Sequence, residues 1–285
     1  MLTAGGTVTY LTEPLNVLRP GIFRLPVRHD YTYVHSGNEA DFLPIFQEAV
    51  RLRPHVLGEL RAIRAPMDVG RVGVHVGQFL RGRIGGRRIL FKDPYAVFSA
   101  EWFADRLGCR VVVVVRHPAA VVSSLRRLGW RAPLASLSAQ PVLVRDWLEP
   151  FRDDLTAAQN IASLRRDLIW SNAVLWRMIY FAVATYAERR SDFVIVRHED
   201  LSRDPEHAYR RVYEALELRY DRRAAAAVKA TTDGTNPAEL PQNNPHSVRL
   251  DSRANLGNWR RRLSSVEIER IRSLTEPVAS RWYPD

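Results

Sequence analysis

Charged side chains gather directly after three short apolar runs of the sequence. The polar residues that end or follow these runs are Lys92 with Asp93, Arg116 with His117, and His198 with Glu199 and Asp200. In open parallel sheets, ligands bind beyond the carboxyl ends of the strands. If the three runs are strands, these clusters are therefore in the right place to bind an anionic ligand.

Arg116 and Ser124, eight residues apart, form the pair with the clearest chemistry. A guanidinium offers a fork of charged donors and a hydroxyl adds another, which suits a phosphate group. The spacing alone equally allows an arginine exposed at a strand end and a serine that faces solvent. His117 is interpreted as a helix cap or backbone anchor rather than a catalyst, and Pro118 as the first helical residue.

The elements that must position these residues follow an alternating pattern. The apolar runs at residues 87–92, 110–115 and 193–197 each lead into a helical pattern. The second run is rich in valine, as expected for a strand that is buried on both faces of a parallel sheet. This alternation predicts an α/β fold of three layers with a central parallel sheet. No linker or internal repeat is visible, so residues 1–285 are predicted to form one domain.

The helical patterns cover residues 97–107, 118–128 and 205–216. In the second of these, Val121, Leu125 and Leu128 have the spacing of a buried stripe. Ala120 and Ser124 share a neighbouring face, where small side chains would let a ligand approach.

Further sequence signals mark helix ends, a loop and a long apolar helix. Asp204 with Pro205 predicts a capped helix start, and residues 264–267 (SSVE) fit a capping box. Residues 231–257 are predicted to form a long loop. Residues 168–187 are apolar but contain polar side chains, which indicates a buried amphipathic helix rather than a membrane span.

Composition limits the classes of function. The 285-residue chain has 42 basic residues against 31 acidic ones, a formal charge of +11, and only Lys92 and Lys229 are lysines. This charge favours anionic partners. The single cysteine, Cys109, excludes a disulfide framework, and the eight histidines lack metal-ligand spacing, so we expect no metal. No signal peptide or membrane span is recognised, and a cytoplasmic protein is expected.

Three segments together resemble one enzyme family. Residues 111–118 followed by Ser124 resemble a strand, an Arg-x-Pro motif and a serine. Residues 196–201 (VRHEDL), followed by Asp204 and Pro205, resemble "RYEDL…DP", and residues 252–260 (SRANLGNWR) resemble "RKGxxGDWK". These are motifs of the sulfotransferases that use 3′-phosphoadenosine 5′-phosphosulfate (PAPS), and the resemblance extends over roughly residues 8–275.

The resemblance implies a P-loop NTPase-like sulfotransferase fold and a set of nucleotide-binding residues. Arg116 and Ser124 would hold the 3′-phosphate, and Arg253 would be a weaker basic contact. His198 stands where the family has a tyrosine near the nucleotide, and Gly257 matches the C-terminal loop directly.

The N-terminal part resembles carbohydrate sulfotransferases in particular. Residues 10–17 (YLTEPLNV) are similar to "YLYEPxxHV", in which a glutamate just after the first helix is the candidate general base. The resemblance assigns that role to Glu13, and assigns to Lys92 the stabilisation of charge on the transferred group. Without the resemblance, Glu13 is an exposed acid before a proline turn and Lys92 a surface lysine. A lysine can nevertheless be tuned to exchange a proton, which arginine cannot.

The implied reaction moves a sulfuryl group from PAPS to a hydroxyl of a small molecule or glycan, with no metal and no nucleic acid. Aromatic residues such as Tyr31, Tyr33 and Trp147 could stack on a sugar, but core packing is the better explanation for each.

One part of the family pattern has no counterpart. The family binds the phosphosulfate on a glycine-rich loop resembling "PRSGTT", whereas residues 4–7 (AGGT) are too short and lack a basic residue. The resemblance places residues 4–7 at the end of the first helix and Met1 inside it, so the chain is expected to lack the first strand and to bind PAPS poorly. Either the sequence begins too late, or transferase activity has been lost.

Two other classes remain open. The charge of +11 also suits a non-catalytic protein that binds nucleic acid or another polyanion, although the arginines are spread along the whole chain without a recognised motif. A nucleotide kinase would need its own phosphate loop and a magnesium-binding carboxylate, and neither is identifiable.

Overall fold

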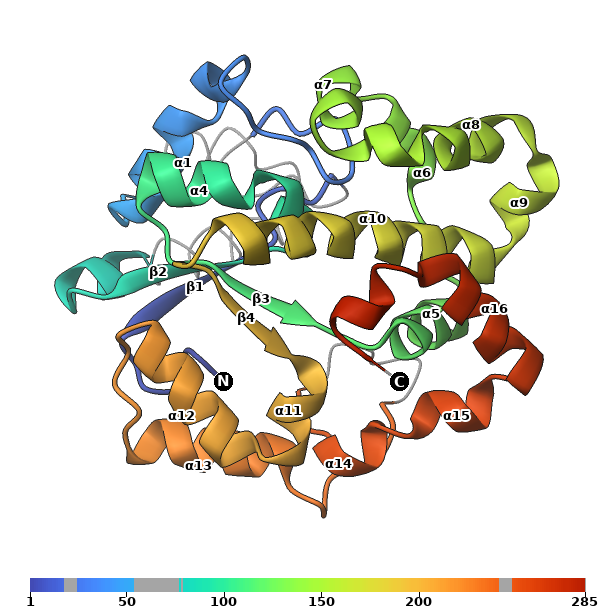
Figure 1. Cartoon of the computed structure of the whole chain (residues 1–285). Helices are drawn as coiled ribbons and strands as arrows, with labels where there is room; N and C mark the ends of the chain where they lie inside the picture. The colour runs from blue at the N-terminus through green and yellow to red at the C-terminus, as the bar shows by residue number, and fades with distance from the viewer. Residues whose placement is uncertain (18–24, 54–76, 78, 241–247, 285) are drawn as a thin grey trace, which may run out of the picture. The chain divides into compact units, whose positions relative to one another are not determined.

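The computed structural model describes residues 1–17, 25–53, 77, 79–240 and 248–284 (Figure 1). The chain divides into two compact units. The N-terminal unit comprises Leu2–Cys109, and the C-terminal unit comprises Arg110–Asp285 together with Met1. Each unit contains a pair of parallel strands and several helices, so the predicted α/β class with parallel strands is confirmed.

In the N-terminal unit, strand β1 (Val8–Thr12) pairs in parallel with strand β2 (Arg88–Lys92). Residue 8 pairs with residue 88 and residue 12 with residue 92, so both strands end at the same level. Residues 79–84 are helical, and a Cβ on Gly82 would come within 2.3 Å of the Thr9 hydroxyl. Only glycine lets this helix approach β1 so closely.

A largely aromatic core supports this strand pair. Phe46 of helix α1 (Leu43–Val50) is fully buried and contacts the rings of Phe91 and Phe103 edge-on. The remaining elements are the 3₁₀ helices η1 (Glu39–Asp41) and η2 (Pro94–Ser99) and helix α4 (Ala100–Leu107). The predicted strand at 87–92 and helical pattern at 97–107 are therefore both present.

In the C-terminal unit, strand β3 (Val112–Val115) pairs in parallel with strand β4 (Val194–Arg197), and Val115 is in register with Arg197. Helix α10 (Leu168–Arg189) packs against helix α5 (Pro118–Arg127) and helix α16 (Ser265–Thr275), as Figure 1 shows. Both further strands expected from the sequence are thus present.

Shorter elements complete this unit. Between α5 and α10 the chain forms α6 (Leu134–Ser138), α7 (Pro141–Leu143), a π-helical turn η3 (Val144–Leu148), η4 (Glu149–Phe151), α8 (Arg152–Asn160) and α9 (Ala162–Arg166). After β4 come α11 (His198–Arg203), α12 (Pro205–Ala215), α13 (Arg222–Thr232), α14 (Ser252–Asn255), α15 (Asn258–Arg262) and, near the C-terminus, η5 (Ala279–Arg281).

Helix α10 has the length and apolar composition of a membrane span, but 72% of its most apolar window is buried inside the protein. This agrees with the prediction of a buried helix. Polar side chains such as Ser171 and Asn172 are buried in it as well, so the helix is enclosed on most sides rather than amphipathic.

The predicted buried stripe of α5 is wrong. Val121, Leu125 and Leu128 are only half-buried, whereas the fully buried residues of the helix are Pro118, Ala119, Ala120, Val122 and Ser123. The small residues are the ones buried because α5 lies between α10, α15 and α16, and small side chains let helices pack closely. Ala120 therefore packs in the core instead of lining a ligand site.

Two further expectations need correction. Val114 of β3 is 44% exposed, so β3 is not buried on both faces. Residues 2–7 form turns and bends rather than the end of a helix, and β1 follows directly, so Glu13 comes after a strand and not after a helix.

The predicted helix caps are confirmed. Asp204 accepts a hydrogen bond from the His207 amide at 3.3 Å, and Ser264 and Glu267 form both bonds of a capping box. The predicted loop 231–257 begins inside α13 and contains α14, and its residues 241–247 lie outside the described part.

Candidate functional site

Glu13 and Lys92 meet at the carboxyl ends of β1 and β2. Because Thr12 is in register with Lys92, the residue after β1 lies next to the end of β2, and the Glu13 amide donates to the Lys92 carbonyl at 2.8 Å. The Lys92 ammonium donates to Glu13 Oε1 at 2.6 Å. The Glu13 side chain is 18% exposed and that of Lys92 is 53% exposed. The structure thus brings together the two residues predicted to be catalytic.

The carboxylate of Glu13 is held in one orientation. Its second oxygen, Oε2, accepts a hydrogen bond from the Asn16 side-chain amide at 2.8 Å. The backbone of Glu13 has φ 45°, a left-handed conformation that is uncommon for residues other than glycine. Such strain clusters at functional sites, where the surrounding structure holds it in place.

Asp93 is the neighbouring carboxylate, and its two oxygens fasten two segments together. Oδ2 accepts from the Leu15 amide at 2.6 Å and Oδ1 accepts from the Tyr95 amide at 2.9 Å, which also caps η2. Burial raises the pKa of Asp93 to about 6, and the charge of Glu13 adds to this rise, while the two backbone bonds oppose it. Asp93 therefore holds the loop after β1 against the end of β2.

In the C-terminal unit, Arg116 follows β3 directly, and α10 holds its backbone in place. The Trp176 indole donates to the Arg116 carbonyl at 2.9 Å, and the Arg116 amide donates to the Tyr180 hydroxyl at 3.2 Å. The guanidinium is largely buried, which lowers the pKa of Arg116, and the charge of Glu199 partly offsets this effect.

The guanidinium of Arg116 has hydrogen-bond donors without partners. Its Nε atom is buried without a hydrogen-bond partner, and among the described residues this side chain forms no hydrogen bond or ion pair. A buried unpaired donor is unfavourable, and an anionic ligand would satisfy it.

Glu199 connects three segments around Arg116. Oε1 accepts from the His117 amide at 3.0 Å, and Oε2 accepts from the Tyr283 hydroxyl at 2.6 Å. The ring of His117 stacks on Trp259 at 4.7 Å, and its Nδ1 accepts from the Ala119 amide at 3.2 Å. His117 is therefore the helix cap and anchor that the sequence indicated.

His198 lies beside Arg116 because the two residues each come directly after an in-register pair of strand ends, Val115 and Arg197. Its Nδ1 lies 3.5 Å from the Ser202 hydroxyl. Burial lowers the pKa of His198 to about 4, the charge of Arg116 lowers it further, and Glu199 opposes both. We call Arg116, Tyr180, His198, Glu199 and Tyr283 the Arg116 cluster.

The other predicted nucleotide-binding residues are less closely associated with this cluster. Ser124 lies half-buried on α5, and the buried hydroxyl without a partner on that helix belongs to Ser123. Arg253 is exposed, and its Nε donates to the Arg203 carbonyl at 2.8 Å, which ties α14 to the end of α11. Among the described residues, no hydrogen bond or ion pair joins Ser124 or Arg253 to Arg116.

Gly257 precedes α15 with φ −93°, and a Cβ built on it would meet nothing within 4 Å. Neither backbone conformation nor packing therefore requires glycine at this position.

Sequence reasoning missed the roles of Asp93, Glu199 and Tyr283. The first two stand in the polar clusters that follow strands, so their position was visible, but their hydrogen-bond partners are set by contacts distant in the chain. Tyr283 gives no sequence signal at all, since it reaches Glu199 from 84 residues away.

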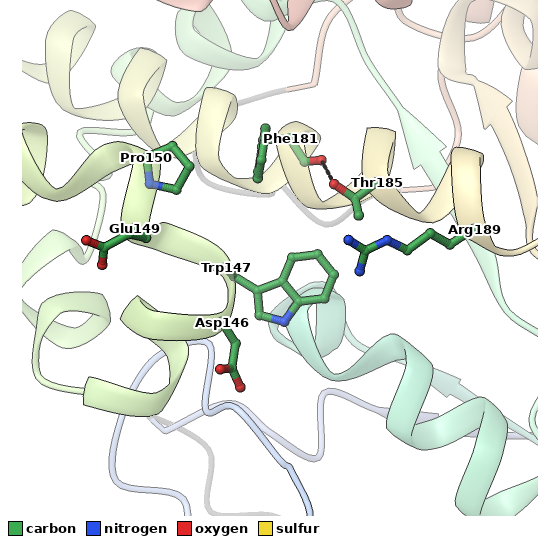
Figure 2. Close-up of a pocket in the computed structure, with 7 residues that line it drawn as sticks. All are labelled: Asp146, Trp147, Glu149, Pro150, Phe181, Thr185 and Arg189. Carbon is green, nitrogen blue, oxygen red and sulfur yellow. Dashed lines mark hydrogen bonds between the residues drawn. The ribbon is translucent and has the colours of Figure 1, made fainter.

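A separate pocket of about 160 Å³ opens on the C-terminal unit (Figure 2). It is lined by Asp146, Trp147, Glu149, Pro150, Phe181, Thr185 and Arg189. Trp147 is 7% exposed and packs edge-on against Tyr186, so it is mainly a core residue, as expected from the sequence. The two carboxylates that line the pocket already form ion pairs, Asp146 with Arg145 and Glu149 with Arg152.

Within the described residues, no group of three or more His, Cys, Asp or Glu side chains is placed to hold a metal ion. Cys109 is half-buried, and burial raises the pKa of its thiol to about 11. Comparison with protein-family models, curated proteins and solved structures finds no match for this chain.

Proposed function

We propose that this protein is a sulfotransferase, which moves a sulfuryl group from PAPS to a hydroxyl acceptor, with a carbohydrate as the acceptor class. Beyond the α/β class with parallel strands, we also propose a particular fold, a three-layer P-loop NTPase-like domain of the sulfotransferase type. It depends on the resemblance of four ordered segments, and the observation that carries it is the Glu13–Lys92 pair at the matched ends of two parallel strands.

The proposed chemistry uses each member of this pair. Glu13 takes the proton of the acceptor hydroxyl as the oxygen attacks sulfur and the bond between sulfur and the nucleotide's phosphate oxygen breaks. Lys92 stabilises the negative charge that develops on the sulfuryl oxygens and the leaving oxygen. Asn16 orients the Glu13 carboxylate. The half-exposed Lys92 ammonium can leave this carboxylate when negative charge develops on the sulfuryl oxygens and the leaving oxygen.

The nucleotide-binding part of the proposal rests on the Arg116 cluster. A buried guanidinium with an unpaired Nε provides charged donors for the 3′-phosphate. Arg253 and Ser124 are proposed as weaker contacts, since each lies on an element that packs beside the cluster.

The test is transfer of radiolabelled sulfate from PAPS to a panel of mono- and disaccharides. Glu13→Gln is expected to lower turnover roughly 100-fold or more, as for loss of a general base, and to change nucleotide affinity less than about two-fold. Glu48→Gln on α1 is the matched control in the same unit and should keep full turnover.

Other outcomes identify the alternatives. Nucleotide binding without any transfer would indicate an inactive homologue. An affinity for polyanions that falls steeply with salt and does not respond to nucleotide would indicate a polyanion-binding protein. Equal loss of turnover and affinity in Glu13→Gln would contradict its role as a base.

A further inference from the structure

His198 stands at a position where protonation would create a second cation next to Arg116. It follows β4 as Arg116 follows β3, and neighbouring strands lie about 4.8 Å apart. The guanidinium next to it is buried, with an Nε atom that has no partner. An anion that reaches this guanidinium would therefore also come close to the imidazole.

The charges around His198 leave it neutral in the free protein. Arg116 repels a second positive charge, and Glu199 is the opposing carboxylate. That carboxylate already accepts from the His117 amide and from the Tyr283 hydroxyl, so its negative charge is shared. Burial and Arg116 together outweigh it, which holds the pKa of His198 well below its usual range.

Other charged groups lie on α11 itself and on the elements packed around it. Arg197 is neutralised by Asp200 through two hydrogen bonds of 2.9 and 3.0 Å. Tyr180 of α10 and Arg262 of α15 act on Arg116. Asp204, Glu206 and His207 lie at the start of α12, and Asp251 and Arg253 lie at the start of α14.

We propose that His198 couples anion binding to proton uptake, so that the Arg116 cluster takes a sulfate or phosphate group together with one proton from solvent. A dianion beside Arg116 attracts the imidazolium and so opposes both the burial and the repulsion that keep the imidazole neutral, and the added proton gives His198 a second N–H donor. The inference rests on the proposed function for the identity of the ligand. The coupling between anion binding and proton uptake, however, applies to any doubly charged tetrahedral anion.

The probe of choice is inorganic sulfate, since its charge is fixed across the pH range, whereas a phosphate monoester itself titrates near pH 6. If the bound state restores an ordinary histidine pKa of about 6.5, sulfate should bind roughly 20-fold more tightly at pH 5 than at pH 7. Isothermal calorimetry in two buffers of different ionisation enthalpy should count close to one proton taken up per sulfate at pH 5.

Variants separate His198 from the other histidines. His198→Gln should lose both the proton uptake and the pH dependence, and His198→Tyr, which introduces the tyrosine of the resembling family, should do the same. His207→Gln, at an exposed position on α12, is the matched control and should keep both. The proton count on the unmodified protein needs no variant, so it decides the question even if a substitution prevents folding.

The outcomes distinguish this inference from the proposed function. Sulfate binding without proton uptake, or an unchanged pH dependence in His198→Gln, overturns the inference. Adenosine 3′,5′-bisphosphate that binds without proton coupling supports the proposed function and overturns only the coupling. Proton-coupled sulfate binding with no affinity for the bisphosphate supports the coupling and contradicts the nucleotide site. Binding of neither contradicts both.

Discussion

The two pairs of parallel strands end in polar clusters of opposite electrostatic character. After β1 and β2, Glu13 and Lys92 form an ion pair whose lysine is half-exposed to solvent. After β3 and β4, Arg116 is largely buried, has no partner on Nε and faces a histidine kept neutral. The same position in the same kind of element thus supplies an ion pair in one unit and a cation with an unpaired donor in the other. The residue types differ between the two clusters, and so does their burial, which leaves Lys92 half-exposed and Arg116 largely buried.

The largest expected effect comes from removing the carboxylate of the buried cluster. Glu199→Ala takes away the only described carboxylate shown to offset Arg116 and leaves the Tyr283 hydroxyl without its acceptor. The His117 amide loses its acceptor as well. Each buried donor left without an acceptor costs about 1–3 kcal/mol, so urea unfolding followed by circular dichroism should show a total loss of about 3 kcal/mol or more. Glu214→Ala, at an exposed position on α12, should change stability by less than about 0.5 kcal/mol. Equal effects of the two substitutions would contradict the buried-cluster interpretation.

The stability of the two clusters should depend on pH in different ways. The folded-state pKa of Asp93 is raised to about 6, so between pH 4 and pH 6 the folded chain keeps a proton that the unfolded chain has lost. Its contribution to stability is therefore full below about pH 4 and is lost as the pH rises through 6, by about 3 kcal/mol. The difference in unfolding free energy between the unmodified protein and Asp93→Asn should fall by this amount from pH 4 to pH 7.

His198 should act in the opposite direction over nearly the same window. Its folded-state pKa is depressed to about 4, so the unfolded chain binds a proton first, and stability is lost as the pH falls from about 6.5 towards 4. His198→Gln should remove this loss and leave the Asp93 effect in place. Each variant is compared with the unmodified protein by its unfolding free energy. If the pH dependence of this difference had the same sign for Asp93→Asn and His198→Gln, the predicted opposition between the two groups would be wrong.

The smallest effect is expected at the exposed ion pair. Lys92→Met removes a lysine whose side chain is 53% exposed, and such pairs contribute less than about 1 kcal/mol. Urea unfolding should therefore register little change, while the sulfate-transfer assay should register a large one if Lys92 stabilises the transferred group. A stability loss as large as that of Glu199→Ala would show that the two clusters do not differ as described.

Much of the local structure was predictable from the sequence. The strands β2, β3 and β4 and the caps at Asp204 and Ser264 follow from short-range patterns, because apolar runs and capping residues act within a few positions of the chain. The buried face of α5 was predicted wrongly because helix periodicity alone does not show which side meets three other helices.

The candidate site was predictable only in part. Lys92 was predicted at the end of a strand, but Glu13 was expected after a helix, so the sequence did not predict that the two residues meet at the ends of paired strands, where hydrogen bonds of 2.6 and 2.8 Å join them. Two features could not be foreseen, since both depend on helix packing. Among the described residues no hydrogen bond joins Ser124 to Arg116, and Arg253 binds the carbonyl at the end of α11.

The sequence by itself determined which residues end the strands and therefore which charges stand at their carboxyl ends. Only the tertiary structure decided how deeply each charge is buried and what it pairs with, since Tyr283 joins Glu199, and Trp176 and Tyr180 join Arg116, from distant parts of the chain. The physical reason is that burial and electrostatic pairing sum over everything packed nearby, whereas strand ends and caps are fixed by immediate neighbours.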